Sequence, residues 1–487
     1  MSAFEKIKFC NTFHRLPSHF YTPLKPTPLP DPELVSVNTP LLARFGIDAE
    51  TEDRLALARL GAGQLVLEGM APLAQKYTGH QFGHYNPDLG DGRGILLGEV
   101  LDQDGQRWDW HLKGAGQTPY SRFGDGRAVL RSTIREYLAS EALHALGIPS
   151  TRALFITRSP HQVMREQPES AATLVRATPT HVRFGHFEYA RIHQGNDAVR
   201  QLADYTVETV YPHLQQETNP ARRHEALLRE VLERTAQLIA DWQAFGFVHG
   251  VMNTDNMSVL GETFDYGPFA FMEAFRAGFV ANHTDAGGRY AYNRQPEVGY
   301  WNCQMLVRCF QDLLPDDTLR RTMRHYETTY NSAFMARMRA KLGLEEEEAE
   351  DTQLVIGLFR LLQQEETDFT LFFRALCDWE SDPQGLHDLF VDRALPEEWL
   401  KNYGQRLTRE TTAPEKRQQQ MRHANPRYVL RTGLAQTAIE QAENGDYTEI
   451  DRLLDVLRQP YDEQPESAHY ARPSADGGRH ISLSCSS

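Results

Sequence analysis

Strand-like patterns come first along this chain, and long helical patterns follow them. From Trp108 to Lys113 apolar and polar residues alternate, which is the period of a strand with one face on a core. Similar short runs occur at 95–100, 153–157 and 173–177. A helix is predicted over 132–146, and from residue 225 onward the apolar spacing is that of long amphipathic helices. This order predicts an α+β protein with a small strand-containing lobe followed by a mainly helical lobe.

Two further segments flank these lobes. The proline-rich stretch 21–32 favours extended backbone and predicts an arm along the surface of the body, with short helices over 55–74. Beyond Thr329 the patterns are helical, which predicts a helical C-terminal extension. The predicted division is an arm with short helices, a strand-containing lobe, a helical lobe and an extension, at 1–80, 81–190, 191–330 and 331–487.

Charge and composition exclude several classes of protein. The 487 residues include 51 Lys and Arg against 66 Asp and Glu, a net charge of −15. This balance gives no general attraction to phosphate backbones or anionic lipid, so neither a nucleic acid nor a membrane is an expected partner. The N-terminal sequence lacks the apolar core of a secretory signal, and the five cysteines form no CxxC pair. We therefore expect a reduced, cytoplasmic protein.

Gly90, Gly92 and Arg93 belong to a segment, GDGRG, with the composition of a phosphate-binding loop. Glycines allow main-chain N–H groups to approach a phosphate, and Arg93 adds a positive charge. Taken alone, however, the segment favours a glycine-rich hairpin turn over a phosphate loop.

Lys113 and Glu136 each have two interpretations. Lys113 ends the alternating strand on its polar face, where a lysine is usually solvated but can also reach a nucleotide. Glu136 lies in the following helix, within Thr133-x-x-Glu136, the pattern of a capping box in which the glutamate only caps the helix start. The two residues alone leave both questions open.

The segment from Phe247 to Gly267, FVHGVMNTDNMSVLGETFDYG, resembles the protein-kinase motifs HRDxxxxN and DFG. Asn256 takes the place of the metal-binding asparagine and Asp265 that of the DFG aspartate, with a short strand expected over 257–260. Amide and carboxylate oxygens are ligands that Mg²⁺ prefers, together with phosphate oxygens. The segment therefore predicts a site for a magnesium-bound nucleotide.

One position departs from the kinase pattern. The aspartate that accepts the substrate proton in kinases is replaced by Val251, which cannot exchange a proton. The nearest carboxylate is Asp255, which can accept a proton or orient a metal-bound water. Ordinary phosphoryl transfer is therefore in doubt.

Arginines gather near the strand that carries Lys113. Arg176 and Arg183 flank the segment 177–182 at the end of the last predicted strand, and the string SRFGDG, which contains Asp125 and Gly126, follows the lysine. Guanidinium groups bind phosphate oxygens at two points, although each arginine alone is more often a surface ion-pair partner. Together with Arg93 they favour a pocket that buries the terminal phosphates and leaves the α-phosphate as the exposed electrophile.

Four strings resemble the selenoprotein O family of kinase-like protein adenylyltransferases: GHQFGHYNPDLGDGRG, HLKGAGQTPYSRFGDGRAVLRSTIREYL, FVHGVMNTDNMSVLGETFDYGPF and NPRYVLR. The likeness runs over almost the whole chain. It implies a protein-kinase-like bilobal fold that binds ATP inverted relative to a kinase. It also implies transfer of AMP to Ser, Thr or Tyr hydroxyls of protein substrates, with release of pyrophosphate.

The resemblance also implies roles for individual residues. Lys113 would contact the phosphates and pair with Glu136, Asp255 would accept the proton, and Asn256 and Asp265 would bind Mg²⁺, with Mn²⁺ as the alternative ion. The implied nucleotide-binding residues are Gly90, Gly92, Arg93, Lys113, Asp125, Gly126, Arg176, Arg183 and Asp265.

Cys485 matches a position that holds selenocysteine in some relatives, and some members are thought to join it to the activation segment. Here Ala281 stands where such a partner would sit, so an internal redox lock is doubtful and an oxidisable tail thiol is at least an equal interpretation. Two other functions stay open: an atypical protein kinase that uses Asp255 as its base, and a non-catalytic ATP-binding pseudokinase scaffold.

Overall fold

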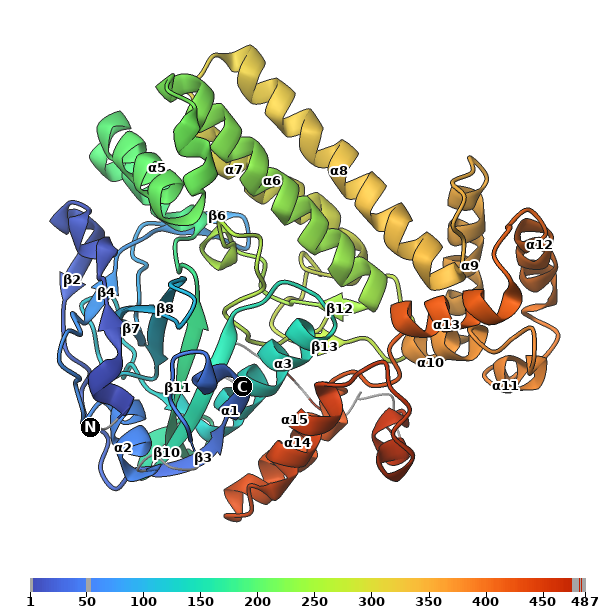
Figure 1. The fold of residues 1–487 in the computed structure, drawn as a ribbon, viewed down its shortest axis with the longest axis horizontal. Helices are drawn as coiled ribbons and strands as arrows, with labels where there is room; N and C mark the ends of the chain where they lie inside the picture. Colours follow the sequence, from blue (N-terminus) through green and yellow to red (C-terminus); the bar gives the residue numbers. More distant parts are fainter. Residues whose placement is uncertain (1–2, 50–53, 475–480, 482, 484–487) are drawn as a thin grey trace.

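The computed structural model describes residues 3–49, 54–474, 481 and 483. Strands dominate its first part and helices the rest, so the chain has a mixed α+β fold (Figure 1). One large antiparallel sheet lies on one side of the molecule, and the long helices α6 and α8 run beside each other on another. None of the helices in the described part of the chain combines the length and apolar character of a membrane span.

The main sheet has the strand order β2-β4-β7-β8-β11-β10-β3, with β1 paired to β7 and β9 to β11. Its strands are β1 Lys8–Phe9, β2 Tyr21–Pro23, β3 Glu33–Val37, β4 Leu73–Gln75, β7 Gly94–Leu101, β8 Arg107–Lys113, β9 Ala128–Val129, β10 Arg152–Met164 and β11 Pro168–Thr178. The predicted arm therefore does more than follow the surface, because it contributes β2 to the sheet. Two small antiparallel pairs lie outside this sheet: β5 Gly79–Gln81 with β6 His84–Asn86, and β12 Phe247–Val248 with β13 Ala270–Phe271.

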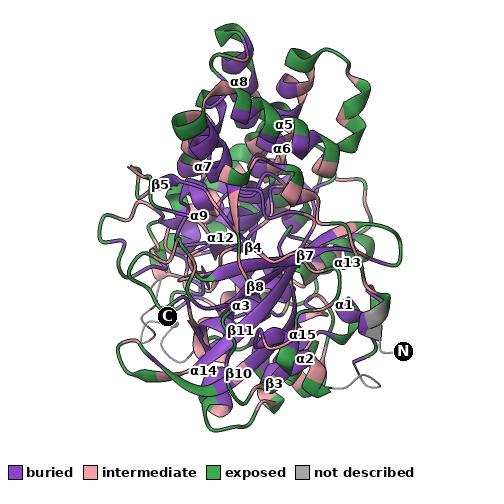
Figure 2. Cartoon of the chain, turned by 90° about the vertical axis from the view of Figure 1, so that its left-hand side faces the viewer, coloured by how far each residue is buried: buried purple, intermediate pink, exposed green. Residues whose placement is uncertain are grey.

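Strand β8 lies inside the sheet and is buried on both faces, as the purple strands of Figure 2 show. Trp110 and Leu112 pack with side chains of the helices α1 Thr39–Ala43 and α2 Arg54–Gly61. The opposite face carries Asp109, His111 and Lys113, and Lys113 is only 2% exposed. The expectation of a half-buried strand is therefore wrong, because the polar face is covered by protein, and of the two interpretations of Lys113 the solvated one does not hold.

Helix α3, Leu130–Ala145, packs on β10 and β11 and places Glu136 under β8. The remaining helices are α4 Phe184–Tyr189, α5 Asn196–Val210, α6 Pro220–Phe245, α7 Gln295–Arg308, α8 Asp316–Leu342, α9 Asp351–Glu365, α10 Phe369–Leu376, α11 Pro383–His387, α12 Glu397–Leu407, α13 Pro414–Ala424, α14 Thr432–Glu443 and α15 Thr448–Leu457. Helix α6 ends at Gly246, whose φ of 68° is the left-handed conformation that favours glycine at a helix end.

Two local predictions differ from the structure. Residues 257–260 form a bridge and a turn, because within the described chain only Ser258 pairs with a neighbouring segment, at Arg183, and Ser258 Oγ accepts a hydrogen bond from Leu260 N at 3.1 Å within the turn. In the range 55–74 helix α2 ends at Gly61, and the following residues lead into strand β4. A hypothetical Cβ on Gly61 would lie 2.2 Å from Thr157 Oγ1, so this glycine allows the helix to approach the sheet closely.

The C-terminal helices contact the sheet-containing part directly. Helices α14 and α15 pack against α3, and Asp451 Oδ1 accepts a hydrogen bond of 2.6 Å from Ser36 Oγ in β3. Arg458 Nη2 likewise donates to Asn38 Oδ1 at 2.9 Å. Residues more than 400 positions apart in the sequence are thereby held together.

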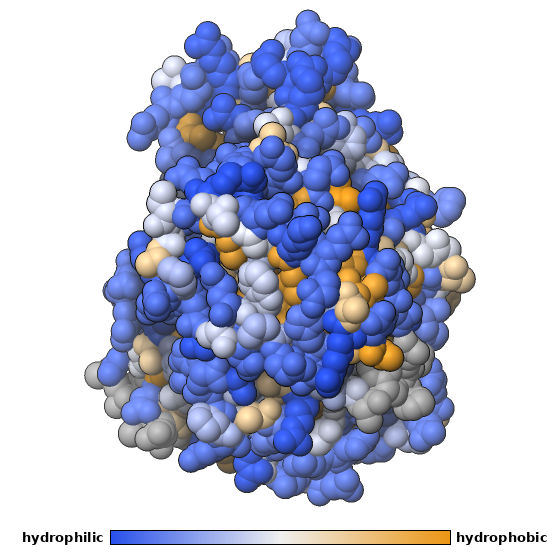
Figure 3. Space-filling model, turned by 90° about the vertical axis from the view of Figure 1, so that its right-hand side faces the viewer, coloured by the Kyte–Doolittle hydropathy of each residue, from blue (hydrophilic) through white to orange (hydrophobic). Residues whose placement is uncertain are grey.

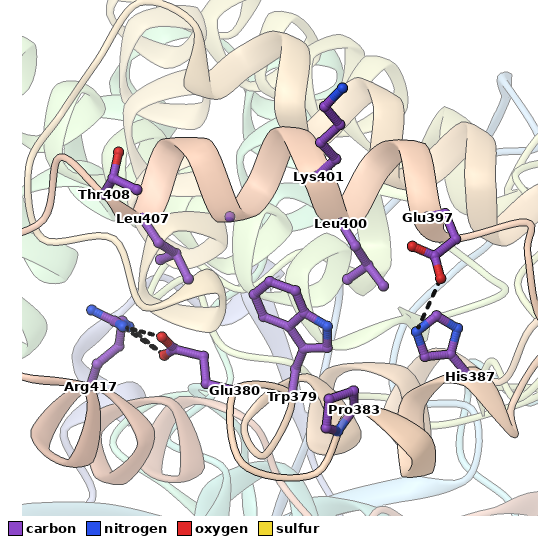
Figure 4. A pocket seen from close by; sticks show the side chains of 11 residues that line it. Trp379, Glu380, Pro383, His387, Glu397, Leu400, Lys401, Leu407, Thr408 and Arg417 are labelled. Carbon is purple, nitrogen blue, oxygen red and sulfur yellow. Dashed lines mark hydrogen bonds and ion pairs between the residues drawn. The ribbon is translucent and has the colours of Figure 1, made fainter.

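A groove of about 740 Å³ lies within the C-terminal extension, between α12 and the helices α11 and α13 (Figure 4). Leu400 extends into it from α12 and Trp379 from the opposite side, and ion pairs of Glu380 with Arg417 and of Glu397 with His387 lie at its two ends. The side of the molecule that faces the viewer in Figure 3 is mostly hydrophilic, with apolar side chains visible between polar ones.

Candidate active site

A cavity of about 680 Å³ contains nearly all of the residues that the sequence singled out. Its walls include Gly90, Gly92, Arg93, Lys113, Asp125, Gly126, Arg176, Arg183, Asp255, Asn256 and Asp265. These residues come from the loop before β7, from β8 and the loop after it, from β11 and the segment that leads to α4, and from the segment between β12 and β13, so the fold brings four distant pieces of sequence to one place. Seven Lys and Arg side chains and four Asp side chains line the cavity, which makes it basic within an acidic protein.

Glu136 lies beneath this cavity between two cations. Its Oε2 is 2.5 Å from Lys113 Nζ and 3.0 Å from Arg176 Nη2, and its Oε1 accepts from Arg176 Nε. Burial acts to raise the pKa of Glu136, but Arg176 and Lys113 outweigh it and lower that pKa, so the carboxylate is ionised. Thr133 Oγ1 bonds to Val129 O and the helix begins at Leu130, so the capping-box interpretation of Glu136 is wrong.

Lys113 has an unusually low basicity. Burial lowers its pKa to about 8, and repulsion by Arg93 and Arg176 acts in the same direction against the attraction of Glu136. The lysine is positively charged at neutral pH and close to the point where it loses its proton.

Asp265 joins the two arginines of the cavity. Its Oδ1 is 2.7 Å from Arg176 Nη1, and its Oδ2 contacts Arg183 Nη1. Burial acts to raise the pKa of Asp265, but Arg183 and Arg176 hold it far below its usual range. The φ of Asp265 is 55°, in the left-handed region, which turns this carboxylate toward the arginines. Neither arginine is a surface residue, since Arg176 and Arg183 are 5% and 1% exposed.

Arg183 is fixed from several sides. Its guanidinium lies 4.5 Å from the ring centres of both Tyr77 and Phe264, and its Nη1 donates to Asp255 O at 3.0 Å. Aromatic faces and carboxylates together hold the planar group in one orientation before any ligand arrives.

Asp255 lies in a short 3-10 turn, Thr254–Asn256, and faces the cavity. Burial raises its pKa to about 7, and the nearby Asp265 adds to this while Arg183 opposes it. A carboxyl group with a pKa near neutrality is suited to exchange a proton at neutral pH. Val251, in the place of the kinase base, also lines the cavity and is 7% exposed.

Asn256 and Asp265 provide a donor set that fits Mg²⁺. Asn256 Nδ2 donates to Val251 O at 3.0 Å, which leaves the amide oxygen as the free donor atom. Asp265 adds carboxylate oxygens, and hard oxygen donors are the ligands Mg²⁺ prefers. Within the described ranges, no group of three His, Cys, Asp or Glu residues could hold a metal ion.

The glycine-rich segment is packed tightly against the loop at 118–121. A Cβ on Gly90, whose φ is 149°, would lie 2.6 Å from the Tyr120 ring, and Thr118 Oγ1 donates to Asp91 O at 2.7 Å. The segment connects β6 to β7, which belong to different sheets, so the hairpin-turn interpretation is wrong.

Asp125 and Gly126 form the opposite rim of the cavity. Asp125 Oδ2 is 2.8 Å from Arg165 Nη1, and the Gly126 carbonyl accepts from Gly116 N at 3.0 Å. A Cβ on Gly126 would lie 2.0 Å from Gly116 O, so only glycine fits there.

Several polar residues at the cavity were missed in the sequence. Gln81 reaches Asp255, and His111 Nε2 is 3.3 Å from Asp91 Oδ2. The glycines around Gln81 in GHQFG were the available signal, since they mark a close approach of backbone. No comparable signal marked His111, because its contact depends on the sheet register.

Cys485 lies outside the described residues, but Leu483 shows where the chain passes shortly before it. Leu483 O accepts hydrogen bonds from His283 N at 3.0 Å and from the His283 ring at 2.5 Å. Ala281, two residues from His283, is buried.

Comparisons with known proteins agree with this chemistry. The family model described as "Protein adenylyltransferase SelO" matches residues 3–458. Similar proteins include "Protein nucleotidyltransferase YdiU" of Pectobacterium carotovorum subsp. carotovorum, 49% identical over 98% of both chains. Proteins of the same name from Myxococcus xanthus and Pseudomonas aeruginosa are 47% and 48% identical over 100% of both chains. The relatives and the basic cavity both indicate an enzyme that transfers nucleotidyl groups. The chain belongs to the SelO family of protein adenylyltransferases.

Proposed function

We propose that this protein transfers AMP from ATP to Ser, Thr or Tyr hydroxyls of protein substrates, with Mg²⁺ and with release of pyrophosphate. One observation carries the proposal. Val251, in the place of the kinase base, and Asp255, a buried carboxyl group whose pKa is about 7, line the same basic cavity. The proposal includes a protein-kinase-like arrangement of two lobes with the four segments predicted above, and a cytoplasmic location.

The cations of the cavity would bind the triphosphate. Lys113, Arg176 and Arg183 are buried and held in place by carboxylates, whereas Arg93 is exposed to the cavity. Preassembled donors stabilise developing negative charge without reorganising during the reaction. With the terminal phosphates bound at these cations, inverted relative to a kinase, the α-phosphate would face Asp255.

The bond changes then follow from the position of Asp255. The hydroxyl oxygen of the acceptor forms a bond to the α-phosphorus, the bond from that phosphorus to the bridging oxygen of the β-phosphate breaks, and pyrophosphate leaves. Asp255 accepts the hydroxyl proton, which a group with a pKa near 7 can do at neutral pH. A bound Mg²⁺, held by Asn256 and Asp265, would neutralise charge on the leaving pyrophosphate.

The test uses ATP labelled at either the α- or the γ-phosphate, with Mg²⁺ and a pool of synthetic peptides that carry Ser, Thr and Tyr. The proposal predicts that only the α-label is retained on peptide. Retention of the γ-label alone would indicate an atypical kinase, and ATP binding without any transfer would indicate a scaffold; either result refutes the proposal.

An Asp255→Asn variant tests the role of the carboxyl group. The amide cannot accept the proton, so the transfer rate should fall by about 100-fold or more, in line with the usual contribution of a general base. Stabilisation by ATP, measured by thermal shift, should persist, because the cations of the cavity are unchanged.

A further inference from the structure

Backbone N–H groups of the β5–β6 hairpin donate hydrogen bonds to side chains in and beside the Asp255 turn. His80 N donates to Thr254 Oγ1 at 2.7 Å, and Phe82 N donates to Tyr290 OH at 2.9 Å and to Asn253 Oδ1 at 3.3 Å. Tyr290 OH in turn donates to Asn253 Oδ1 at 2.6 Å. These contacts hold the hairpin in place without help from the Gln81 side chain.

The Gln81 side chain instead contacts Asp255 and the neighbouring strand. Its Nε2 donates to Asp255 Oδ2 at 3.2 Å, and Gln81 lines the cavity. Its Oε1 accepts from Asn86 Nδ2 on the neighbouring strand at 3.2 Å. Because Asn86 supplies a donor, the oxygen of the Gln81 amide must face Asn86, and its NH₂ group must face the carboxyl.

Gly79 covers the other side of the same carboxyl group. A Cβ on Gly79 would lie 2.8 Å from Asp255 Oδ1, so a larger residue would displace the carboxyl. Asp255 Oδ1 is buried and has no hydrogen-bond partner among the described residues, whereas Oδ2 is occupied by Gln81. The hairpin therefore binds one carboxyl oxygen through Gln81 and covers the other through Gly79.

We propose that Gln81 is a positioning residue for Asp255: its amide binds Oδ2 and thereby holds the carboxyl group in the orientation in which it accepts the proton of the acceptor hydroxyl. This inference rests on the proposed function. Gln81 acts through Asp255 and not on the nucleotide, so its loss should slow the transfer step without weakening ATP binding. Misplacing a catalytic group by about 1 Å can reduce a rate by about 100-fold.

The test compares kinetics of α-label transfer to the peptide pool for the wild type and Gln81→Met, which keeps the length of the side chain and removes its donor. We expect kcat to fall by about tenfold or more, with KM for ATP and the thermal shift produced by ATP unchanged. His84→Ala is the matched control, since His84 is exposed on the same hairpin and should keep wild-type kinetics. A higher KM for ATP with unchanged kcat would overturn the inference, because Gln81 would then contact the nucleotide.

A double variant separates positioning from a general effect on the fold. In an Asp255→Asn background, Gln81→Met should cause little further loss, since the group that it positions is already absent. If the fold-losses in transfer rate of the two single variants multiply in the double variant, the two residues act independently and the inference is refuted.

The outcomes also separate this inference from the proposed function. If the wild type transfers no α-label, the proposed function fails and the inference fails with it. If the wild type and Gln81→Met transfer the label at equal rates, the inference alone fails.

Discussion

Single residues of the cleft combine positive charge with burial, and Lys113 shows the consequence most clearly. The sequence predicted that Lys113 contacts the nucleotide phosphates and pairs with Glu136, because the family resemblance implies both. The burial of Lys113 could not be predicted, because alternation identifies a polar face but not what covers that face. Asp255 illustrates the same limit: the sequence supplies the carboxyl group, whereas the fold supplies the burial that raises its pKa to about 7.

ATP binding should weaken as the pH rises through about 8, where Lys113 loses its proton. Below this pKa the charged lysine attracts phosphate, and above it Lys113 must take up a proton when ATP binds. Isothermal titration calorimetry at pH 7 and pH 9.5 should show several-fold weaker binding at the higher pH. A Lys113→Met variant should bind weakly with a much flatter pH dependence; an unchanged slope would contradict this assignment.

At the scale of elements, the long periodic segments were predicted well and the short irregular ones were not. Helix α3 was predicted over 132–146 and spans Leu130–Ala145, because its apolar repeat is clear and Gly147 follows its end. The segment 257–260 was expected to be a strand, but its backbone contacts with Val182 and Arg183 are tertiary and leave no periodic signal. The loops that form the cleft belong to this second class.

Gly126→Ala should deform the rim of the cleft. The φ of Gly126 is 70°, and the added Cβ would meet Gly116 O, so the 3.0 Å hydrogen bond between Gly116 N and Gly126 O should break. We expect ATP affinity to fall by about tenfold, roughly the energy of one hydrogen bond plus strain, measured by calorimetry. Gly278→Ala is the control, because a Cβ there meets nothing within 4 Å; equal affinities for both variants would contradict the prediction.

Lys341, near the end of α8, should destabilise the fold at neutral pH. Its Nζ lies 4.2 Å from the centre of the Phe373 ring and 5.1 Å from that of Phe245, and burial lowers its pKa to about 7. A lysine whose folded pKa is lowered opposes folding most below that pKa, and the penalty fades as the pH rises toward the unfolded value. Lys341→Met should therefore raise the free energy of unfolding by about 1–4 kcal/mol at pH 7, and by much less near pH 10.

Denaturant unfolding at both pH values measures this difference. Lys401→Met, on the exposed face of α12, serves as the control and should change stability little at either pH. If Lys341→Met raises the free energy of unfolding equally at both pH values, the removal of the lysine charge is not the cause of the stabilisation.

At the scale of the whole molecule, the C-terminal extension ties the sheet to the helices. The sequence predicted these helices but not their partners, because contacts across hundreds of residues leave no local pattern. Arg431, before α14, is 1% exposed and is bound to Asp368 Oδ2 at 2.7 Å and to Glu273 Oε2 at 3.1 Å. It thus links the extension to the segment that follows β13.

Arg431→Leu should lower the free energy of unfolding by about 3–5 kcal/mol, since it leaves two carboxylates in the interior without their cation. Denaturant unfolding provides the measurement. Arg452→Leu is the control, because Arg452 is exposed and its 3.8 Å contact with Glu449 should contribute less than about 1 kcal/mol. Equal losses in the two variants would contradict the structural role of Arg431.

The same connection bears on how the chain matures during translation. Domains usually fold as the ribosome delivers them, N-terminal part first. Here Ser36 and Asn38 bond to Asp451 and Arg458, so these early segments meet those partners only after more than 400 further residues have been made. A nascent chain that already carries every residue of the cleft should therefore gain full rigidity only after its final helices emerge from the exit tunnel.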